Sequence, residues 1–467
     1  MIKTVNKFMM FVLLITAAVF LPVCTTYAED DKPILEPIKV ISTTEQALSF
    51  TFSYIENKDL TMKVLDKLDE LNVKGTFFVS EEEMKKYPDI VKEIASRGHE
   101  IGVSTVNRAS DTYERKLAEM NRSFNLLQKN FGTSTKLVKQ IRGVIPEFSQ
   151  QAIKDSGGVL IGQSINLMQA KHQAIDDTDL MVRELFGRYK FSFGRGEIIF
   201  FQLDFYANKE IIIELIDKVK RTRVDSIAYS TPFDNPEINP QNDSAYAVKP
   251  VGVVMANEKY LWEFPVDPKN YIPYLQKDGN YIGVTEDTVV SEGSKRYIGA
   301  PTVNKNNRMY GFSKPDMRKL DYKGKIRTDE NVVFLTFDDW GTDAAVNKLL
   351  YVFRKHNLKG TFYVITNRVV PNQNLLRAIA LEGHEIGSHS HEHRPMSIMG
   401  KKGLYAPTQT YEEMLEDYST SFKFLRSVVG DIEVDGRPAL YRTFRPPTMA
   451  VSKKGFEALF RSGFEKI

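Results

Sequence analysis

Three short blocks in the first half of the chain recur in the second half, each displaced by 285 residues. The pairs are TFSY at 51–54 with TFDD at 336–339, GTFFV at 75–79 with GTFYV at 360–364, and GHEIG at 98–102 with GHEIG at 383–387. Three matches at one offset, with no gap, are hard to produce by chance, and such a period indicates a repeated structural unit. The sequence therefore predicts two copies of one domain.

Each copy alternates strand and helix patterns, most clearly the second. Residues 332–337 form a continuous apolar run typical of a buried parallel strand. A helix at 344–356 ending before Lys359-Gly360, a strand at 361–365, a helix at 375–382 and a short strand ending at Ser388 are expected to follow. This order implies parallel pairing through crossover helices, hence an α/β barrel or open sheet with its functional groups beyond the carboxyl ends of the strands.

The length of 467 residues, 42% of them hydrophobic, is ample for two or three domains. We expect a signal peptide at 1–28, a degenerate first copy at 45–224, a connector at 225–330 and the second copy at 331–467. The connector is rich in Pro, Asn and Tyr, so it is expected to be turn-rich and partly β. Its tyrosines are expected to serve packing or surface roles more often than to line a sugar groove.

The N-terminus predicts export. Residues 1–7 contain two lysines, 8–23 are almost wholly apolar, and 26–28 place small residues before a cleavage point. The apolar run is short for the alternative, a transmembrane anchor. A lipoprotein signal before Cys24 is disfavoured because Val23 is bulky. The protein is therefore expected to be secreted or in the cell envelope, and without cysteine after cleavage its metal sites would use His and carboxylate ligands.

The charge balance argues against one class of partner. Lys plus Arg number 63 and Asp plus Glu number 60, a net charge of +3, and no basic stripe is visible. A protein that reads nucleic-acid phosphates normally has a basic excess. We expect no nucleic-acid partner, and no stable membrane partner after signal cleavage.

A cluster of histidines and acids in the second copy predicts a metal site. His389 and His393 are four residues apart, so on a helical turn both imidazoles would project from one side and could share a metal. Asp338 and Asp339 follow an apolar strand, and two adjacent carboxylates there need compensation that a divalent cation would supply. The alternative for Asp339 is a helix N-cap. His391, between the ligands, would face away.

The repeat provides a control within the chain. The first copy has Ser53, Tyr54, Ser104 and Arg108 where the second has Asp338, Asp339, His389 and His393. Framework residues survive in both copies while the candidate ligands are absent from the first as a set. His384 differs, because its counterpart His99 persists, and both are therefore expected to be structural.

At these residues a resemblance becomes specific. TFDD at 336–339, HSHEH at 389–393 and FRPP at 444–447 resemble the first three motifs of the NodB-homology polysaccharide deacetylases, carbohydrate esterase family 4. The resemblance implies a distorted (β/α) barrel in each copy and metal-dependent hydrolysis of N-acetyl groups. The implied partner is an N-acetylated glycan: peptidoglycan, a chitin-like polymer or poly-N-acetylglucosamine.

The resemblance also implies residue roles. Asp339, His389 and His393 would hold a divalent metal, expected to be Zn with Co or Ni as alternatives, and Asp338 would be the general base. Arg445 would orient Asp338, although a surface ion pair is the alternative for it. The backbone N–H of Thr448 would hold the oxyanion, and Pro446 and Pro447 would contact substrate.

Two departures from the family pattern leave alternatives open. Thr448-Met449 stand where the family usually has an aromatic residue and Gly. The family's last two motifs, including the histidine that protonates the departing amine, have no counterpart before Ile467, and the first copy has Gln202 in that histidine's place. The second copy is thus expected to be truncated. The leading hypothesis is an exported deacetylase; the others are an inactive or weakly active glycan-binding pseudoenzyme and a truncated gene product.

Overall fold

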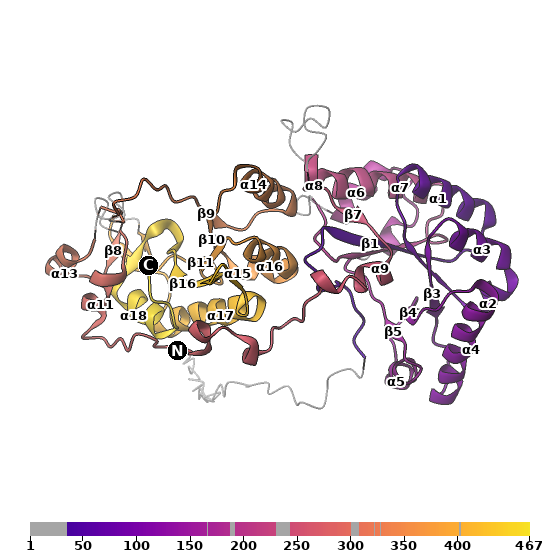
Figure 1. Ribbon diagram of the computed structural model, residues 1–467, viewed down its shortest axis with the longest axis horizontal. Helices are drawn as coiled ribbons and strands as arrows, with labels where there is room; N and C mark the ends of the chain where they lie inside the picture. The colour runs from indigo at the N-terminus through magenta and orange to yellow at the C-terminus, as the bar shows by residue number, and fades with distance from the viewer. Residues whose placement is uncertain are drawn as a thin grey trace, which may run out of the picture.

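The computed structural model describes residues 35–165, 167–186, 192–229, 243–299, 308–321, 323–326, 328–400 and 403–467. The predicted signal peptide, with Cys24, lies outside the described residues, as does the Pro- and Asn-rich stretch 232–242. Two parallel sheets, each flanked by helices, lie side by side (Figure 1). Within the described ranges, no helix combines the length and apolar character needed to cross a bilayer.

The first sheet is parallel along the strand order β5-β4-β3-β2-β1-β6. Its strands are β1 (Ala47–Ser53), β2 (Thr76–Val79), β3 (Glu100–Thr105), β4 (Leu137–Gln140), β5 (Val159–Leu160) and β6 (Ile198–Gln202). Its helices are α1 (Lys58–Glu70), α2 (Glu81–Lys86), α3 (Pro88–Ser96), α4 (Tyr113–Phe131), α5 (Glu147–Asp155), α6 (Thr178–Phe186) and α7 (Ile211–Val219). Every residue of β1 is buried, because β2 and β6 pair with it on either side.

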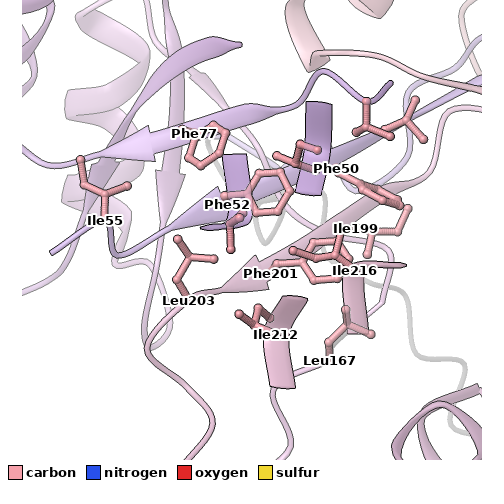
Figure 2. Packing of buried hydrophobic residues seen from close by; sticks show 14 of the residues in the cluster. Phe50, Phe52, Ile55, Phe77, Leu167, Ile199, Phe201, Leu203, Ile212 and Ile216 are labelled. Atoms are coloured by element: carbon pink, nitrogen blue, oxygen red, sulfur yellow. The ribbon is translucent and has the colours of Figure 1, made fainter. Parts of the chain in front are cut away.

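Aromatic stacking forms the centre of this first core. The ring centroid of Phe52 lies 4.7 Å from that of Phe77 on β2 and 5.4 Å from that of Phe201 on β6 (Figure 2). Such pairs stabilise a core beyond the area they bury. Single bridges from Ile38 to Ile161 and from Val40 to Glu197 connect the two ends of the sheet, so the first copy curls into a distorted barrel.

The second sheet is parallel in the order β16-β11-β10-β9. Its strands are β9 (Thr336–Asp339), β10 (Thr361–Val364), β11 (Glu385–Ser388) and β16 (Leu440–Phe444), and its helices are α14 (Asp343–His356), α15 (Thr366–Val369), α16 (Gln373–Leu381), α17 (Tyr411–Val429) and α18 (Lys453–Arg461). Elements β10, β11, α14 and α16 begin 285 residues after β2, β3, α1 and α3, and Thr336, the first residue of β9, lies 285 residues after Thr51 within β1. The repeat in sequence is therefore a repeat of strands and helices in space.

The predicted helix after β9 is confirmed: it begins one residue earlier than expected, at Asp343, and ends at His356 as expected. Thr342 is the N-cap of α14, since its Oγ1 accepts a hydrogen bond of 3.2 Å from the Ala345 N–H. Asp339 is therefore not the cap. Asn357 ends the helix in the left-handed conformation, with φ of 49°, two residues before the predicted stop at Lys359-Gly360.

The prediction of a buried strand over 332–337 is wrong for its first four residues. The strand begins only at Thr336, and the preceding side chains are exposed, Val333 by 85% and Phe334 by 62%. In the described part of the chain β9 pairs with β10 alone, whereas β1 has a neighbour on each side. An apolar run is buried only where neighbouring elements cover it.

The connector contains more helix than expected and is divided between the two cores. Its elements are α8 (Ser226–Tyr229), β7 (Ala247–Val248), α9 (Val251–Met255), α10 (Pro273–Gln276), α11 (Val289–Arg296), β8 (Met309–Tyr310) and α13 (Lys314–Lys319). Strand β7 pairs with β1 of the first copy, whereas Leu275, Val289 and Leu320 belong to the second hydrophobic core. Strand β8 pairs with β17 (Val451–Ser452). The remaining strands form the hairpins β12 (Ser397–Met399) with β13 (Tyr405–Pro407) and β14 (Glu433–Val434) with β15 (Arg437–Pro438).

Candidate metal centre

Three predicted ligands converge at the carboxyl ends of the second sheet. Asp339 is the last residue of β9, His389 follows β11, and His393 lies four residues further along the loop. The Nε2 atoms of the two histidines are 3.3 Å apart. The Oδ1 atom of Asp339 lies 3.3 Å from Nε2 of His393 and 3.6 Å from Nε2 of His389. Parallel strands end at the same edge of a sheet, which brings these distant residues together.

The donor set fits a divalent cation. Tetrahedral zinc with bonds of ~2.0–2.1 Å holds its ligand atoms ~3.3–3.4 Å apart, close to the separations observed. One carboxylate and two imidazoles would leave coordination positions open, as catalytic sites require. Among the described residues, this is the one group of three or more acids, histidines or cysteines whose donor atoms meet in this way.

A backbone contact fixes the ring of His389. Its Nδ1 lies 2.6 Å from the carbonyl oxygen of Arg445, so Nδ1 carries the proton and donates it. The lone pair of Nε2 is then directed at the cluster, an arrangement typical of metal-binding histidines. Burial lowers the pKa of His389, which favours the neutral ring that a metal needs.

The predicted helical turn between the two histidines is wrong, because 389–396 form a loop. Ser390 and His393 both adopt left-handed backbone conformations, with φ of 69° and 57°. The Ser390 Oγ accepts a hydrogen bond of 2.8 Å from the His393 N–H. These left-handed residues, rather than helical spacing, bring the imidazoles together, and such strain persists only where surrounding contacts enforce it.

Asp417 of α17 supplies part of that enforcement, and sequence reasoning missed it. Its Oδ1 accepts hydrogen bonds from the backbone N–H groups of His391, at 2.7 Å, and Glu392, at 3.0 Å. The carboxylate is buried, and burial raises its pKa. An acid on the buried side of an otherwise amphipathic helix was the available signal.

The other two histidines of the cluster lie outside the ligand set. The Nδ1 of His391 is 2.9 Å from Oγ1 of Thr366. The Nδ1 of His384 accepts a hydrogen bond from the Gly360 N–H at 3.2 Å, and that of His99 accepts one from the Gly75 N–H at 3.1 Å. Burial lowers the pKa of His384 and of His99 to about 4. The same contact in both copies agrees with the predicted structural role.

Asp338 lies beside the ligand cluster and is held separately. The Arg445 Nη1 donates hydrogen bonds of 2.9 Å to Oδ1 of Asp338 and to Oγ1 of Thr336. The guanidinium lies over the ring of Tyr363, 4.4 Å from its centroid. Arg445 is thereby fixed on three sides, and the Asp338 carboxylate, 39% exposed, has a defined orientation next to Asp339.

The residues that follow Arg445 differ in accessibility. Pro446 and Pro447 are buried and expose little surface to a ligand. Their contact with substrate stays a prediction. Thr448 is exposed and has a φ of 58°, and its carbonyl accepts a hydrogen bond of 3.0 Å from Nη1 of Arg308. The strained peptide therefore directly follows the FRPP segment.

Comparison with known families identifies the chain. The family model described as polysaccharide deacetylase matches residues 41–158 and 325–466, more than half of the chain. The chain belongs to the polysaccharide deacetylase family. The two matched segments fall in the two copies, so the split match agrees with the duplicated architecture.

Individual relatives of this deacetylase-family chain match over shorter stretches. The peptidoglycan-N-acetylglucosamine deacetylase PgdA of Listeria monocytogenes is 29% identical over 145 residues, which cover 31% of this chain and 27% of that protein. A peptidoglycan-N-acetylglucosamine deacetylase of Bacillus cereus is 27% identical over 143 residues, 31% of this chain and 58% of that protein. The chain thus spans about a quarter to three fifths of these relatives' lengths. The solved structure of peptidoglycan deacetylase PdaC from Bacillus subtilis matches with 17% identity and a TM-score of 0.35, covering 46% of this chain and 92% of that one.

Only the second of the two family segments carries the described ligand group. In the first, Tyr54 occupies the position of Asp339 with nearly the same left-handed backbone, φ of 66° against 70°. Arg142, which follows β4 in the first sheet as Arg445 follows β16 in the second, lies over the Tyr54 ring, 5.2 Å from its centroid. The left-handed backbone at this one position is therefore retained in the first copy although the acids are replaced.

Proposed function

We propose that the second copy is the catalytic domain of an exported, metal-dependent polysaccharide deacetylase that hydrolyses N-acetyl groups of N-acetylglucosamine polymers in the cell wall. The observation that carries this proposal is the convergence of Asp339, His389 and His393, with Asp338 adjacent and held by Arg445. Peptidoglycan is the favoured polymer because the relatives above are named for it. The pattern of residues 1–28 supports export.

Asp339, His389 and His393 would hold the metal, expected to be Zn with Co or Ni as alternatives. Once bound, such an ion polarises the acetamide carbonyl and lowers the pKa of water. The Nδ1 contact of His389 with the Arg445 carbonyl keeps that ring in the tautomer the ion needs.

Asp338 is proposed as the general base that takes the proton of the attacking water. A base must lie within hydrogen-bonding reach of the proton it removes, and Arg445 fixes the Asp338 carboxylate beside the ligand cluster. The backbone N–H of Thr448 would donate to the oxygen on which negative charge develops. Arg445 is thus a positioning residue, and Asp338 the proposed catalytic residue.

The test measures acetate release from N-acetylated chito-oligosaccharide and from peptidoglycan. The protein is first stripped of metal with a chelator and then reloaded with zinc or cobalt. We expect Asp338→Asn to abolish release while keeping its metal, and His389→Ala with His393→Ala to lose both. Glycan and metal binding by the wild-type protein without acetate release would overturn the catalytic proposal in favour of the glycan-binding pseudoenzyme.

A further inference from the structure

A cavity of about 740 Å³ opens beside the ligand cluster, between the two copies. Asp339 and His393 line it from the second copy, together with Trp340 and Arg368. The first copy lines the same cavity with Phe186, Ser192, Gly194 and Glu197. Its volume is in the range of ~300–1,000 Å³ typical of ligand sites. The site where the metal donors meet is therefore walled by both copies.

Buried hydrogen bonds fix the first copy's part of this wall. Arg195, between the cavity-lining Gly194 and Glu197, donates from Nη2 to Oδ1 of Asn347 on α14 at 2.8 Å. Its Nε donates to the Tyr246 hydroxyl at 3.0 Å, and that hydroxyl donates to Asp343 of α14 at 2.7 Å. Satisfied buried networks of this kind specify one arrangement of the groups they join.

A second contact fixes the same segment from α16. The Asn374 Nδ2 donates to the carbonyl oxygens of Arg195, at 2.8 Å, and Ile41, at 2.9 Å, and its Oδ1 accepts from the Thr43 N–H at 3.1 Å. Close packing supports this contact, because a Cβ at Gly194 would lie 3.2 Å from Oδ1 of Asn372. The segment 192–197 is thus held against the second copy on two sides.

We propose that this cavity binds the sugar units next to the one being deacetylated, so that the first copy acts as a wall that determines substrate specificity. The inference rests on the proposed function and deepens it. The partly buried indole of Trp340 offers a face for a sugar ring, and the Ser192 hydroxyl and the exposed Arg368 guanidinium offer polar contacts. The ligand is an N-acetylated oligosaccharide longer than the reacting unit.

The test introduces larger side chains into the cavity at Ser192, a residue of the first copy that lines it. The zinc-loaded full chain is titrated calorimetrically with N-acetylated chitohexaose, using Ser192→Ala, Ser192→Asn and Ser192→Trp. We expect Ser192→Asn and Ser192→Trp to raise the dissociation constant in the order of their side-chain size, at least tenfold for Trp, and Ser192→Ala to raise it less because it removes only the hydroxyl contact. Zinc stoichiometry should be unchanged in all three. The matched control is Ser110→Trp, which enters a separate cavity of about 770 Å³ within the first copy and is expected to leave the dissociation constant unchanged.

The graded series keeps the test decisive if the Trp variant does not fold, because Ser192→Asn must still weaken binding. Unchanged binding in folded Ser192 variants, a wild-type protein that does not bind the hexasaccharide, or a loss confined to Ser110→Trp would each overturn the inference. Failure of the proposed function has a different signature, namely absence of acetate release while the wild-type chain binds the hexasaccharide and the Ser192 series weakens that binding.

Discussion

Removal of the Asp417 carboxylate should weaken metal binding through the ligand loop. In Asp417→Ala the partly buried N–H groups of His391 and Glu392 lose their acceptor. A buried donor left unpaired costs about 1–3 kcal/mol, so two partly buried donors, each near the lower end of that range, cost roughly 2–3 kcal/mol. The loop must hold left-handed residues to bring His389 and His393 together. Loss of these hydrogen bonds destabilises that conformation, so part of the free-energy cost appears as weaker metal binding.

At about 1.4 kcal/mol per tenfold change, the expected loss of zinc affinity is about 10–100-fold. The assay is competition for zinc with a chromophoric chelator, alongside a urea unfolding curve that reports global stability. Two controls separate the loop contact from other effects. Asp417→Asn keeps an acceptor oxygen and should lose less affinity than Ala, and Glu416→Ala removes an exposed neighbouring acid on α17 and should change nothing. Zinc affinity in Asp417→Ala within twofold of wild type would refute the reasoning.

Three further predictions concern Arg445, His384 and Asp343. Arg445→Ala should lower kcat at least about tenfold with zinc content unchanged. Arg445→Lys should recover part of that loss, because a single nitrogen of Arg445, Nη1, donates to Asp338. Equal kcat in the wild type and both variants would contradict this. The folded-state pKa of His384, about 4 against 6.5 for an exposed ring, means that the unfolded chain binds the proton first as pH falls. Its contribution to the unfolding free energy, on the order of 3 kcal/mol, is complete above pH 6.5 and is lost between pH 6.5 and 4. The difference in urea midpoint between the wild type and His384→Gln should therefore shrink as the pH falls through this window. Asp343→Ala leaves the buried Tyr246 hydroxyl without its acceptor and should lower the unfolding free energy by about 2–3 kcal/mol. Burial raises the pKa of the Asp343 carboxyl to about 6, so Asp343→Asn, which keeps an acceptor oxygen and removes a buried charge, should lower it less. Equal urea midpoints for the two variants would contradict this.

The repeat made the fold predictable. The fixed offset aligned strands and helices of the two copies, and the substitution of Ser53 and Tyr54 for two acids pointed to the end of β9 as the site. Such inferences succeed because parallel strands and crossover helices place chain-distant segments at one edge.

Features set by long-range contacts were not predictable. The apolar run before Thr336 resembles a buried strand, yet its exposure depends on which elements lie beside it. The spacing of His389 and His393 suggested a helix, whereas left-handed residues join them in a loop. Asp417 and Arg195 act on segments far from them in sequence. The position of Asp417 on the buried side of α17 marks it as unusual but does not indicate which groups it contacts, and no local pattern predicts the contact of Arg195.

The direct test of the central claim is the metal content of the purified chain after chelation and reloading with zinc. We expect one zinc ion per chain in the wild-type protein and in His391→Ala, whose ring contacts Thr366 rather than the cluster, and none in Asp339→Ala, His389→Ala or His393→Ala. A wild-type chain that takes up no zinc, or ligand variants that retain it, would contradict the account.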